Sequence, residues 1–314
     1  MRVGVVQMNT AVQPVEQRLE QMATHAESCA RAGARVVVFP EMAVPGYTLD
    51  WRGMQWADSV PGNASEGLVA MARSLDIVVV AGVGERSGPH VYNSLVVAGP
   101  SGLLGKYRKI NVSSAERASW RPGSEPTVVT TPVGRIGLGI CADLLWTQPW
   151  RAYRGKVDLV AIASCWPDWF ETTPSLIYGR TRRIHRDAVR TLPERISQAL
   201  GVPVLFANAC GTLDSPLPIL GGRLRGRFAG GSRVVNRGRT VIDDRAEGGH
   251  EVIMGDIEPG EHGAQVDHFR SWIGSLAARA QLQGLDRLTR WISAPAYELR
   301  RRRAARAERS GAST

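Results

Sequence analysis

Glu41, Lys109 and Cys141 are the residues whose types and positions best support covalent chemistry. Cys141 directly follows the short β-rich run 135–140, and Glu41 comes two residues after the apolar run 36–39. Such runs predict buried strands, which hold the next side chain in a fixed place. A cysteine attacks a carbonyl carbon once a base takes its proton. A glutamate can be that base, and a lysine can favour the thiolate and hold a developing oxyanion.

Histidine is the usual partner of a catalytic cysteine, and that pairing is disfavoured here. None of the six histidines follows a predicted buried strand, so a Cys–His protease is a poor fit. The alternative for any single cysteine is a small buried hydrophobe, and lysines and glutamates are common on surfaces. Only the joint placement of Glu41, Lys109 and Cys141 favours catalysis.

The four cysteines predict neither a zinc site nor a disulfide framework. They lie far apart, with no C-x-x-C pair and no histidine at ligand spacing. Free thiols fit a reducing compartment. The first residues read as a strand rather than a signal peptide, and no run approaches the roughly 18 apolar residues of a membrane helix. We therefore expect a cytoplasmic protein with no membrane partner.

The net charge of +10 raises the possibility of nucleic-acid binding, but its distribution argues against that role. Much of the excess lies in segments 180–195 and 300–309, without interleaved aromatic residues or a known binding motif. Nucleic acid is therefore not expected to be the main partner. A solvated helical face, or a contact with a partner subunit, explains the basic tail better.

Hydrophobic periodicity predicts many short strands and a few helices. The pattern indicates two sheets packed face to face with helices outside, a layered α/β domain. We assign residues 1–260 to this domain and 261–314 to a helical, Arg-rich extension that is not an independent domain. The expected strands are 1–8, 36–39, 77–82, 91–98, 128–130, 135–140, 157–163, 202–207, 230–235, 240–243 and 252–257, and the expected helices are 14–32, 64–74 and 186–200.

Several short motifs occur in one order along most of the chain, and in that order they resemble the nitrilase superfamily of carbon–nitrogen hydrolases, in its amidase/carbamoylase-like branch. No single motif is specific for the family. Three of them carry the predicted catalytic residues in the right order and at compatible spacing, and together these three are specific. The motifs are FPE at 39–41, PGY at 45–47, YNS at 92–94, YRKI at 107–110, RPG at 121–123, GICADL at 139–144 and GGSRVV at 230–235.

The resemblance implies a four-layer αββα sandwich, a homodimer or larger homo-oligomer, and no metal or organic cofactor. It also implies roles for five residues. Cys141 would be the nucleophile, Glu41 the general base and Lys109 the stabiliser of the tetrahedral intermediate. Glu116 would position the lysine or the substrate, and the backbone N–H of Ala142 would complete the oxyanion hole. The basic tail would embrace a partner subunit.

The residues after the cysteine bear on the substrate. Nitrilases of the family typically have Trp-Glu there, whereas this chain has Ala142 and Asp143. That difference favours a small carboxamide or N-carbamoyl substrate over a nitrile. Transfer of the acyl group to an amine, by a soluble enzyme, is a second possibility. A non-catalytic interaction protein on the same fold is a third, and the intact catalytic set argues against it.

The pocket wall is expected to differ from that of many family amidases. The loop 147–150 reads TQPW where those enzymes have a Pro-Glu pair. Aromatic residues of the surrounding loops could line the pocket, and Arg180, in a long basic loop 166–183, would suit a substrate carboxylate. The possible pocket residues are Tyr47, Trp51, Trp146, Trp166 and Arg180.

Overall fold

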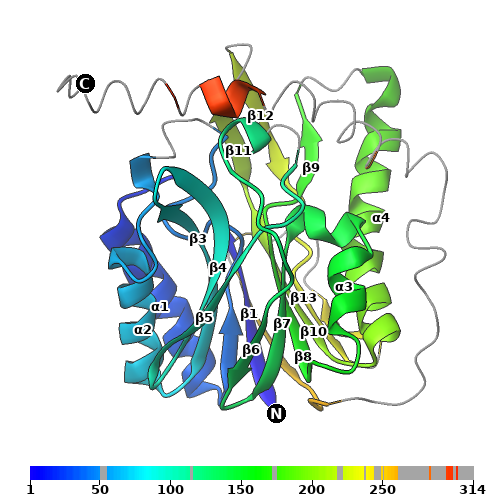
Figure 1. The fold of residues 1–314 in the computed structure, drawn as a ribbon. Helices are drawn as coiled ribbons and strands as arrows, with labels where there is room; N and C mark the ends of the chain where they lie inside the picture. The colour runs from blue at the N-terminus through cyan, green and yellow to red at the C-terminus, as the bar shows by residue number, and fades with distance from the viewer. Residues whose placement is uncertain are drawn as a thin grey trace.

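Twelve strands of one sheet make up the centre of the molecule, seen here in a computed structural model. The structure describes residues 1–49, 55–113, 116–171, 175–217, 222–236, 238–243, 249, 251–260, 283, 295–299 and 302. Within them the sheet folds into two halves that face each other, and we call these the first and the second half-sheet (Figure 1).

The first half-sheet combines parallel central strands with an antiparallel edge. Its short strand β2 has three valines, all buried, as expected for β-branched residues in a strand covered on both faces. The strand order is β15 (Glu251–Asp256), β1 (Arg2–Asn9), β2 (Val36–Val38), β3 (Val78–Ser87), β4 (His90–Gly99) and β5 (Gly102–Arg108).

The second half-sheet repeats this plan. Its strand order is β14 (Arg239–Asp243), β13 (Arg233–Asn236), β10 (Val204–Cys210), β8 (Leu159–Ser164), β7 (Gly134–Ile140) and β6 (Val128–Thr131). The half-sheets are joined where β1 runs parallel to β10, with Met8 opposite Ala209 and Asn9 opposite Cys210. This joint lies at the carboxyl ends of both strands, the edge where ligands bind in α/β sheets.

Helices cover the outer face of each half-sheet (Figure 1). Helices α1 (Val15–Arg31) and α2 (Asn63–Leu75) cover the first, and α3 (Gln148–Tyr153) and α4 (Ser175–Leu200) cover the second. Helix α1 turns Met22, Ala26 and Cys29 inward at helical spacing. The predicted four-layer αββα sandwich is confirmed.

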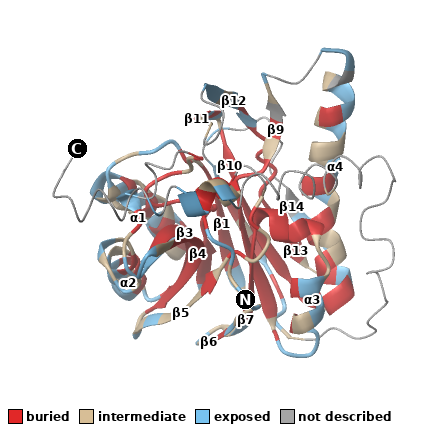
Figure 2. Ribbon diagram, turned by 45° about the horizontal axis from the view of Figure 1, so that its top comes forward, coloured by how far each residue is buried: buried red, intermediate tan, exposed pale blue. Residues whose placement is uncertain are grey.

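The main hydrophobic core fills the space between the two half-sheets and continues beneath α3 and α4, and its strands are buried in Figure 2. Val5 and Val38 of the first half-sheet and Leu138, Ile162 and Leu205 of the second belong to this core and are fully buried. A second core lies between the first half-sheet and helices α1 and α2. The position of one half-sheet against the other is therefore set by close packing.

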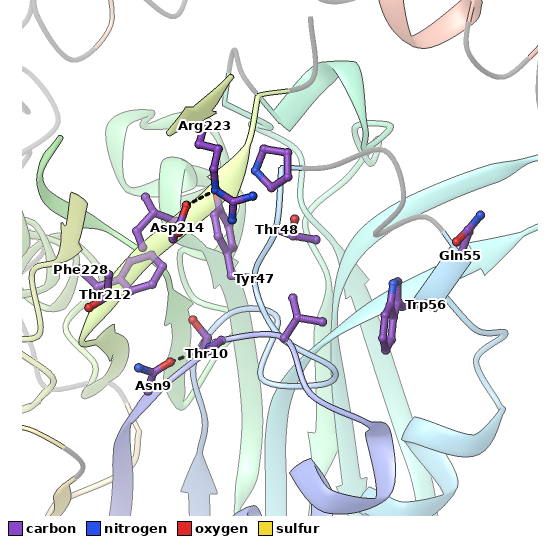
Figure 3. Close-up of a pocket in the computed structure, with 14 residues that line it drawn as sticks. Asn9, Thr10, Tyr47, Thr48, Gln55, Trp56, Thr212, Asp214, Arg223 and Phe228 are labelled. Atoms are coloured by element: carbon purple, nitrogen blue, oxygen red, sulfur yellow. Dashed lines mark hydrogen bonds and ion pairs between the residues drawn. The ribbon is translucent and has the colours of Figure 1, made fainter. Parts of the chain in front are cut away.

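A small antiparallel sheet stands above the joint and departs from the sequence prediction. It consists of β9 (Pro167–Phe170), β12 (Arg223–Phe228) and β11 (Thr212–Pro216), and it borders a cavity (Figure 3). The prediction of one long loop over 166–183 is wrong, because β9 and the first turns of α4 occupy it. Those turns are largely exposed and contain Arg180, Arg182 and Arg183, so periodicity detects no apolar stripe there.

The predicted C-terminal extension lies mostly outside the described residues. Residues 295–299 are helical, and Tyr297 is buried against Met42, Val91 and Trp120 of the same chain. Gln283 donates a hydrogen bond to the Leu145 carbonyl at 2.6 Å. These described parts of the tail therefore contact their own domain. No helix among the described residues is long and apolar enough to cross a membrane.

Candidate active site

Cys141 stands on a sharp turn between β7 and the short 3-10 helix η3 (Cys141–Leu145). Its φ of 44° lies in the left-handed region, which a cysteine adopts only when the surrounding structure imposes it. A buried strand that ends in a strained turn is how several hydrolases present a nucleophile. The sequence placed Cys141 at this strand end, and the backbone geometry adds the strain.

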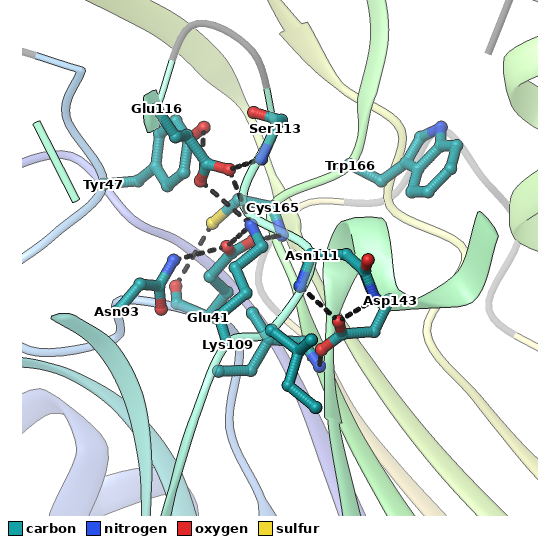
Figure 4. Close-up of polar contacts among 12 residues, drawn as sticks. Glu41, Tyr47, Asn93, Lys109, Asn111, Ser113, Glu116, Asp143, Cys165 and Trp166 are labelled. Carbon is teal, nitrogen blue, oxygen red and sulfur yellow. Dashed lines mark hydrogen bonds and ion pairs between the residues drawn. The ribbon is translucent and has the colours of Figure 1, made fainter. Parts of the chain in front are cut away.

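Glu41, Lys109 and Glu116 form a buried ionic cluster beside this turn (Figure 4). The Lys109 ammonium donates to Glu41 Oε1 at 2.6 Å and to Glu116 Oε2 at 2.7 Å. The exposed fraction of all three side chains is 1% or less. One lysine thus lies between two carboxylates, and the net charge of the cluster is negative when all three are ionised.

Two neutral donors hold the Glu41 carboxylate in place. The Asn93 amide donates to Oε1, and the backbone N–H of Cys165 donates to Oε2, both at 2.7 Å. The sequence reasoning did not assign either residue. Asn93 lies inside the 92–94 motif, so its position could have suggested a role, whereas Cys165 acts through its backbone N–H, which leaves no signal in the sequence.

Glu116 lies in the 3-10 helix η2 (Glu116–Ala118) and has its own donors. The Tyr47 hydroxyl donates to Oε1 at 3.2 Å, and the Ser113 backbone N–H donates to Oε2 at 2.9 Å. Burial raises the pKa of Tyr47 well above its usual value, and the Glu116 charge raises it further. Tyr47 therefore stays protonated and remains a donor.

Asp143 links the cysteine turn to the segment that carries Lys109. Its carboxylate accepts from the Ile140 backbone at 2.9 Å, from the Tyr107 hydroxyl at 2.7 Å, and from both the backbone and the amide of Asn111 at 2.9 Å. Ile140 precedes the cysteine, whereas Tyr107 and Asn111 flank Lys109 in the sequence. A single buried carboxylate thus ties the Cys141 turn to the segment that carries Lys109.

The electrostatics favour a neutral thiol in the resting state. Burial raises the pKa of Cys141 well above its usual value; the Glu41 charge raises it further, and Lys109 opposes the shift. Burial also raises the pKa of Glu41, against the opposing effect of Lys109. For Lys109, burial alone would lower the pKa, but the Glu116 and Glu41 charges raise it well above the usual value. Cys141 therefore needs a base, and Lys109 is a permanent cation.

The predicted pocket residues have different environments. Tyr47 is half-buried and lines a cavity beside the ionic cluster. Trp166 is buried and Trp146 half-buried, both against the main core. Arg180 is exposed on α4 and is not one of the described residues that line the cavity. Trp51 lies outside the described residues. In the described part of the chain, no group of three or more His, Cys, Asp or Glu residues could hold a metal ion.

The sequence matches the carbon-nitrogen hydrolase family over residues 2–265. Curated relatives include a nitrilase from Pyrococcus abyssi, 31% identical over 166 residues that cover 51% of this chain and 63% of that protein. An aliphatic nitrilase from Sinorhizobium fredii is 33% identical over 45% of this chain and 52% of its own length. The chain thus spans roughly half to two thirds of the length of these two relatives.

Solved structures of an amidase from Nesterenkonia share this fold. One mutant carries the product of Michael addition of acrylamide at its active-site cysteine. It gives a TM-score of 0.64 at 19% identity, over 87% of this chain and 100% of that chain. A cysteine-to-alanine mutant of the same amidase holds butyramide and gives a TM-score of 0.62 at 19% identity, over 81% of this chain and 89% of that chain.

Proposed function

Because the chain belongs to the carbon-nitrogen hydrolase family, we propose that it cleaves the C–N bond of a small carboxamide or N-carbamoyl compound through a Cys141 thioester. The observation that carries this proposal is the buried cluster of Glu41, Lys109 and Glu116 beside the strained turn at Cys141. The cluster supplies a base and a fixed cation next to a thiol that is neutral at rest.

In the first half-reaction, Glu41 takes the thiol proton as Cys141 Sγ attacks the substrate carbonyl carbon. Negative charge then develops on the carbonyl oxygen, where Lys109 Nζ and the Ala142 backbone N–H can hold it. The oxygen re-forms its double bond, the C–N bond breaks, and the departing nitrogen takes the proton from Glu41. Ammonia or an amine leaves, and a thioester on Cys141 remains.

In the second half-reaction, Glu41 takes a proton from water as the water oxygen attacks the thioester carbon. The C–S bond breaks, the thiolate recovers the proton from Glu41, and the acid leaves. Glu116 would act as a positioning residue, because it holds Lys109 and does not reach the reacting atoms in this scheme. Removal of one oxyanion donor in such sites costs roughly 3 kcal/mol of barrier.

A nitrile is the second candidate substrate, because the curated relatives named above are nitrilases. Ala142 and Asp143 after the nucleophile favour the amide, as does the amide chemistry named for the Nesterenkonia structures. Capture of the thioester by an amine, which would make the protein a soluble acyltransferase, is the third.

The test is ammonia release from a panel of small amides, carbamoyl amino acids and nitriles. It is run with the wild type, Cys141→Ala and the matched control Cys29→Ala, whose thiol is buried on the inner face of α1. We expect ammonia from an amide or carbamoyl compound, a loss of at least about a thousandfold in Cys141→Ala, and little change in Cys29→Ala. Intact mass spectrometry should find an acyl adduct only where Cys141 is present.

Three outcomes separate the alternatives. Ammonia release that persists in Cys141→Ala contradicts the assignment of the nucleophile. Turnover of nitriles alone moves the proposal to a nitrilase. Faster loss of the acyl adduct with hydroxylamine than with water favours an acyltransferase.

For the whole protein we also propose a homodimer or larger homo-oligomer that works in the cytoplasm. The four free cysteines support a reducing compartment. The family match ends at residue 265, near the boundary at 260 predicted for the catalytic domain. Sedimentation analysis of the full chain tests the assembly.

A further inference from the structure

A cavity of about 520 Å³ lies beside the catalytic cluster, in the size range of small-molecule pockets (Figure 3). Its walls come from the end of β1, the segment after Glu41, and strands β11 and β12. Neither Cys141 nor Lys109 is one of the described residues that line it. Its lining residues include Thr10, Tyr47, Trp56, Thr212, Leu213 and Phe228.

Aromatic side chains form part of the cavity wall, beside polar ones, and the described walls carry no net charge. Tyr47 and Phe228 meet edge to face with ring centroids 5.8 Å apart, and Trp56 supplies a further aromatic surface. The charged lining residues Asp214 and Arg223 form an ion pair with each other, at 2.6 Å. Such walls suit a neutral aromatic or branched apolar group better than a carboxylate.

Two side chains connect this cavity to the catalytic cluster. The Tyr47 ring lines the cavity, while its hydroxyl donates to Glu116, which holds Lys109. Thr10 also lines the cavity, and its hydroxyl lies 3.4 Å from the Cys165 thiol. The backbone N–H of Cys165 in turn holds Glu41. Two residues therefore separate the cavity from Lys109 on one path, Tyr47 and Glu116, and two separate it from Glu41 on the other, Thr10 and Cys165.

We infer that this cavity receives the part of the substrate farthest from the scissile C–N bond, so that preferred substrates are amides with a neutral aromatic or branched apolar acyl group. The inference rests on the proposed function. It is an alternative to the sequence hypothesis of a carboxylate bound by Arg180, which is exposed on α4 and is not one of the described residues that line this cavity. Edge-to-face contact with Tyr47 and Phe228 would orient an aryl group.

The first experiment compares propionamide with 3-phenylpropionamide, which differ by one phenyl group. Thr212 is exposed at the cavity, so Thr212→Phe adds a side chain there without disturbing a buried position. The matched control is Thr24→Phe, the same substitution at an exposed site on α1. We expect the wild type to favour the phenyl substrate in kcat/KM by roughly tenfold or more. Thr212→Phe should bring the ratio of the two kcat/KM values close to one, and Thr24→Phe should keep the wild-type ratio.

The second experiment measures binding without turnover. Calorimetric titration of Cys141→Ala with 3-phenylpropionamide should give a Kd that rises roughly tenfold when Thr212→Phe is added. The inference is overturned if the ratio of kcat/KM for the two amides is the same in the wild type and Thr212→Phe. It is also overturned if the Kd of 3-phenylpropionamide does not change. Absence of amide turnover by the wild type contradicts the proposed function instead, and the titration then still decides whether the cavity binds the aryl group.

Discussion

At the residue scale, the Asn93 side chain should influence the pH range over which the proposed base Glu41 is ionised. Its amide donates to the same Glu41 oxygen that accepts from Lys109. Burial raises the pKa of Glu41, and this hydrogen bond favours the ionised form and opposes the rise. Because the proposed base acts only when it has lost its proton, activity should fall as pH drops through this raised pKa.

Asn93→Ala should therefore move the acidic limb of the kcat/KM profile to higher pH. The variant loses a donor that favours the carboxylate, so Glu41 holds its proton to higher pH. The measurement is kcat/KM for the best amide between about pH 4 and 9, a window around the usual values of Glu and Cys. Asn63→Ala, on the surface of α2, is the control and should keep the wild-type limb. A limb that stays in place or moves to lower pH in Asn93→Ala contradicts this assignment.

Residue types and positions predicted part of the site from the sequence. Glu41, Lys109 and Cys141 could be found because each has a chemically distinctive side chain close behind an apolar or extended run. The role of Cys165 could not be found in that way, since it acts through its backbone N–H. A main-chain donor has no signature in composition or spacing.

At the scale of elements, the turn at Glu41 and Met42, called here the Glu41 turn, packs directly on strand β3. A Cβ added to Gly82 would meet the Met42 backbone nitrogen and would lie 2.7 Å from the Glu41 Cα. That approach is closer than real Cβ contacts, so only glycine fits under this turn.

Gly82→Ala should therefore displace the Glu41 turn. We expect a loss of about 1–3 kcal/mol in the free energy of unfolding from overpacking, and a fall in kcat of roughly a hundredfold from misplacement of the base. Urea unfolding and steady-state kinetics measure the two effects.

Gly179→Ala is the matched control. Nothing lies within 4 Å of a Cβ added at Gly179, and the residue is exposed on α4. Because alanine has a higher helix propensity than glycine, the free energy of unfolding of this variant should rise by about 0.5–1 kcal/mol. Full activity in a folded Gly82→Ala would contradict the close packing.

Elements differed in how well the sequence predicted them, for a physical reason. Strands of the half-sheets, such as β2 and β8, are buried along their whole length and read as continuous apolar runs. Strand β12 has the sequence RLRGRF and an alternation of exposed and buried residues too short and too basic to be noticed. The small sheet it belongs to, and with it the cavity, was therefore missed.

At the scale of the whole molecule, acid stability should depend on Glu85. This fully buried carboxylate lies on β3 and accepts from Ser94 on β4 at 2.7 Å, and from Lys106 and Arg108 on β5 at 2.6 Å each. Burial alone would raise its pKa, but the hydrogen bonds from Arg108 and Lys106 outweigh burial and lower it. One ionised group thus ties three strands together.

Glu85→Gln should cost about 3 kcal/mol of unfolding free energy at pH 7, because it leaves two cations near an uncharged amide. The folded pKa is lowered, so the ionic contribution is fully present above the usual value near 4.5 and is lost as pH falls through the folded value. The difference in the free energy of unfolding between wild type and Glu85→Gln should therefore become smaller in acid.

Chemical denaturation at pH 7 and at pH 3 to 4 measures this difference. The control is Glu66→Gln at an exposed site, whose free energy of unfolding should stay within about 0.5 kcal/mol of the wild type. A difference that does not change with pH would contradict the role of the charge.

The placement of the proposed reacting groups on opposite half-sheets should constrain how this protein can change over evolutionary time. Glu41 and Lys109 belong to the first half-sheet and Cys141 to the second. A core substitution that lets one half slide by a fraction of an ångström leaves the fold intact but alters the spacing between thiol and carboxylate. Selection for turnover should therefore act on the core residues between the half-sheets as well as on the site. Fewer substitutions should be tolerated there than folding alone would allow.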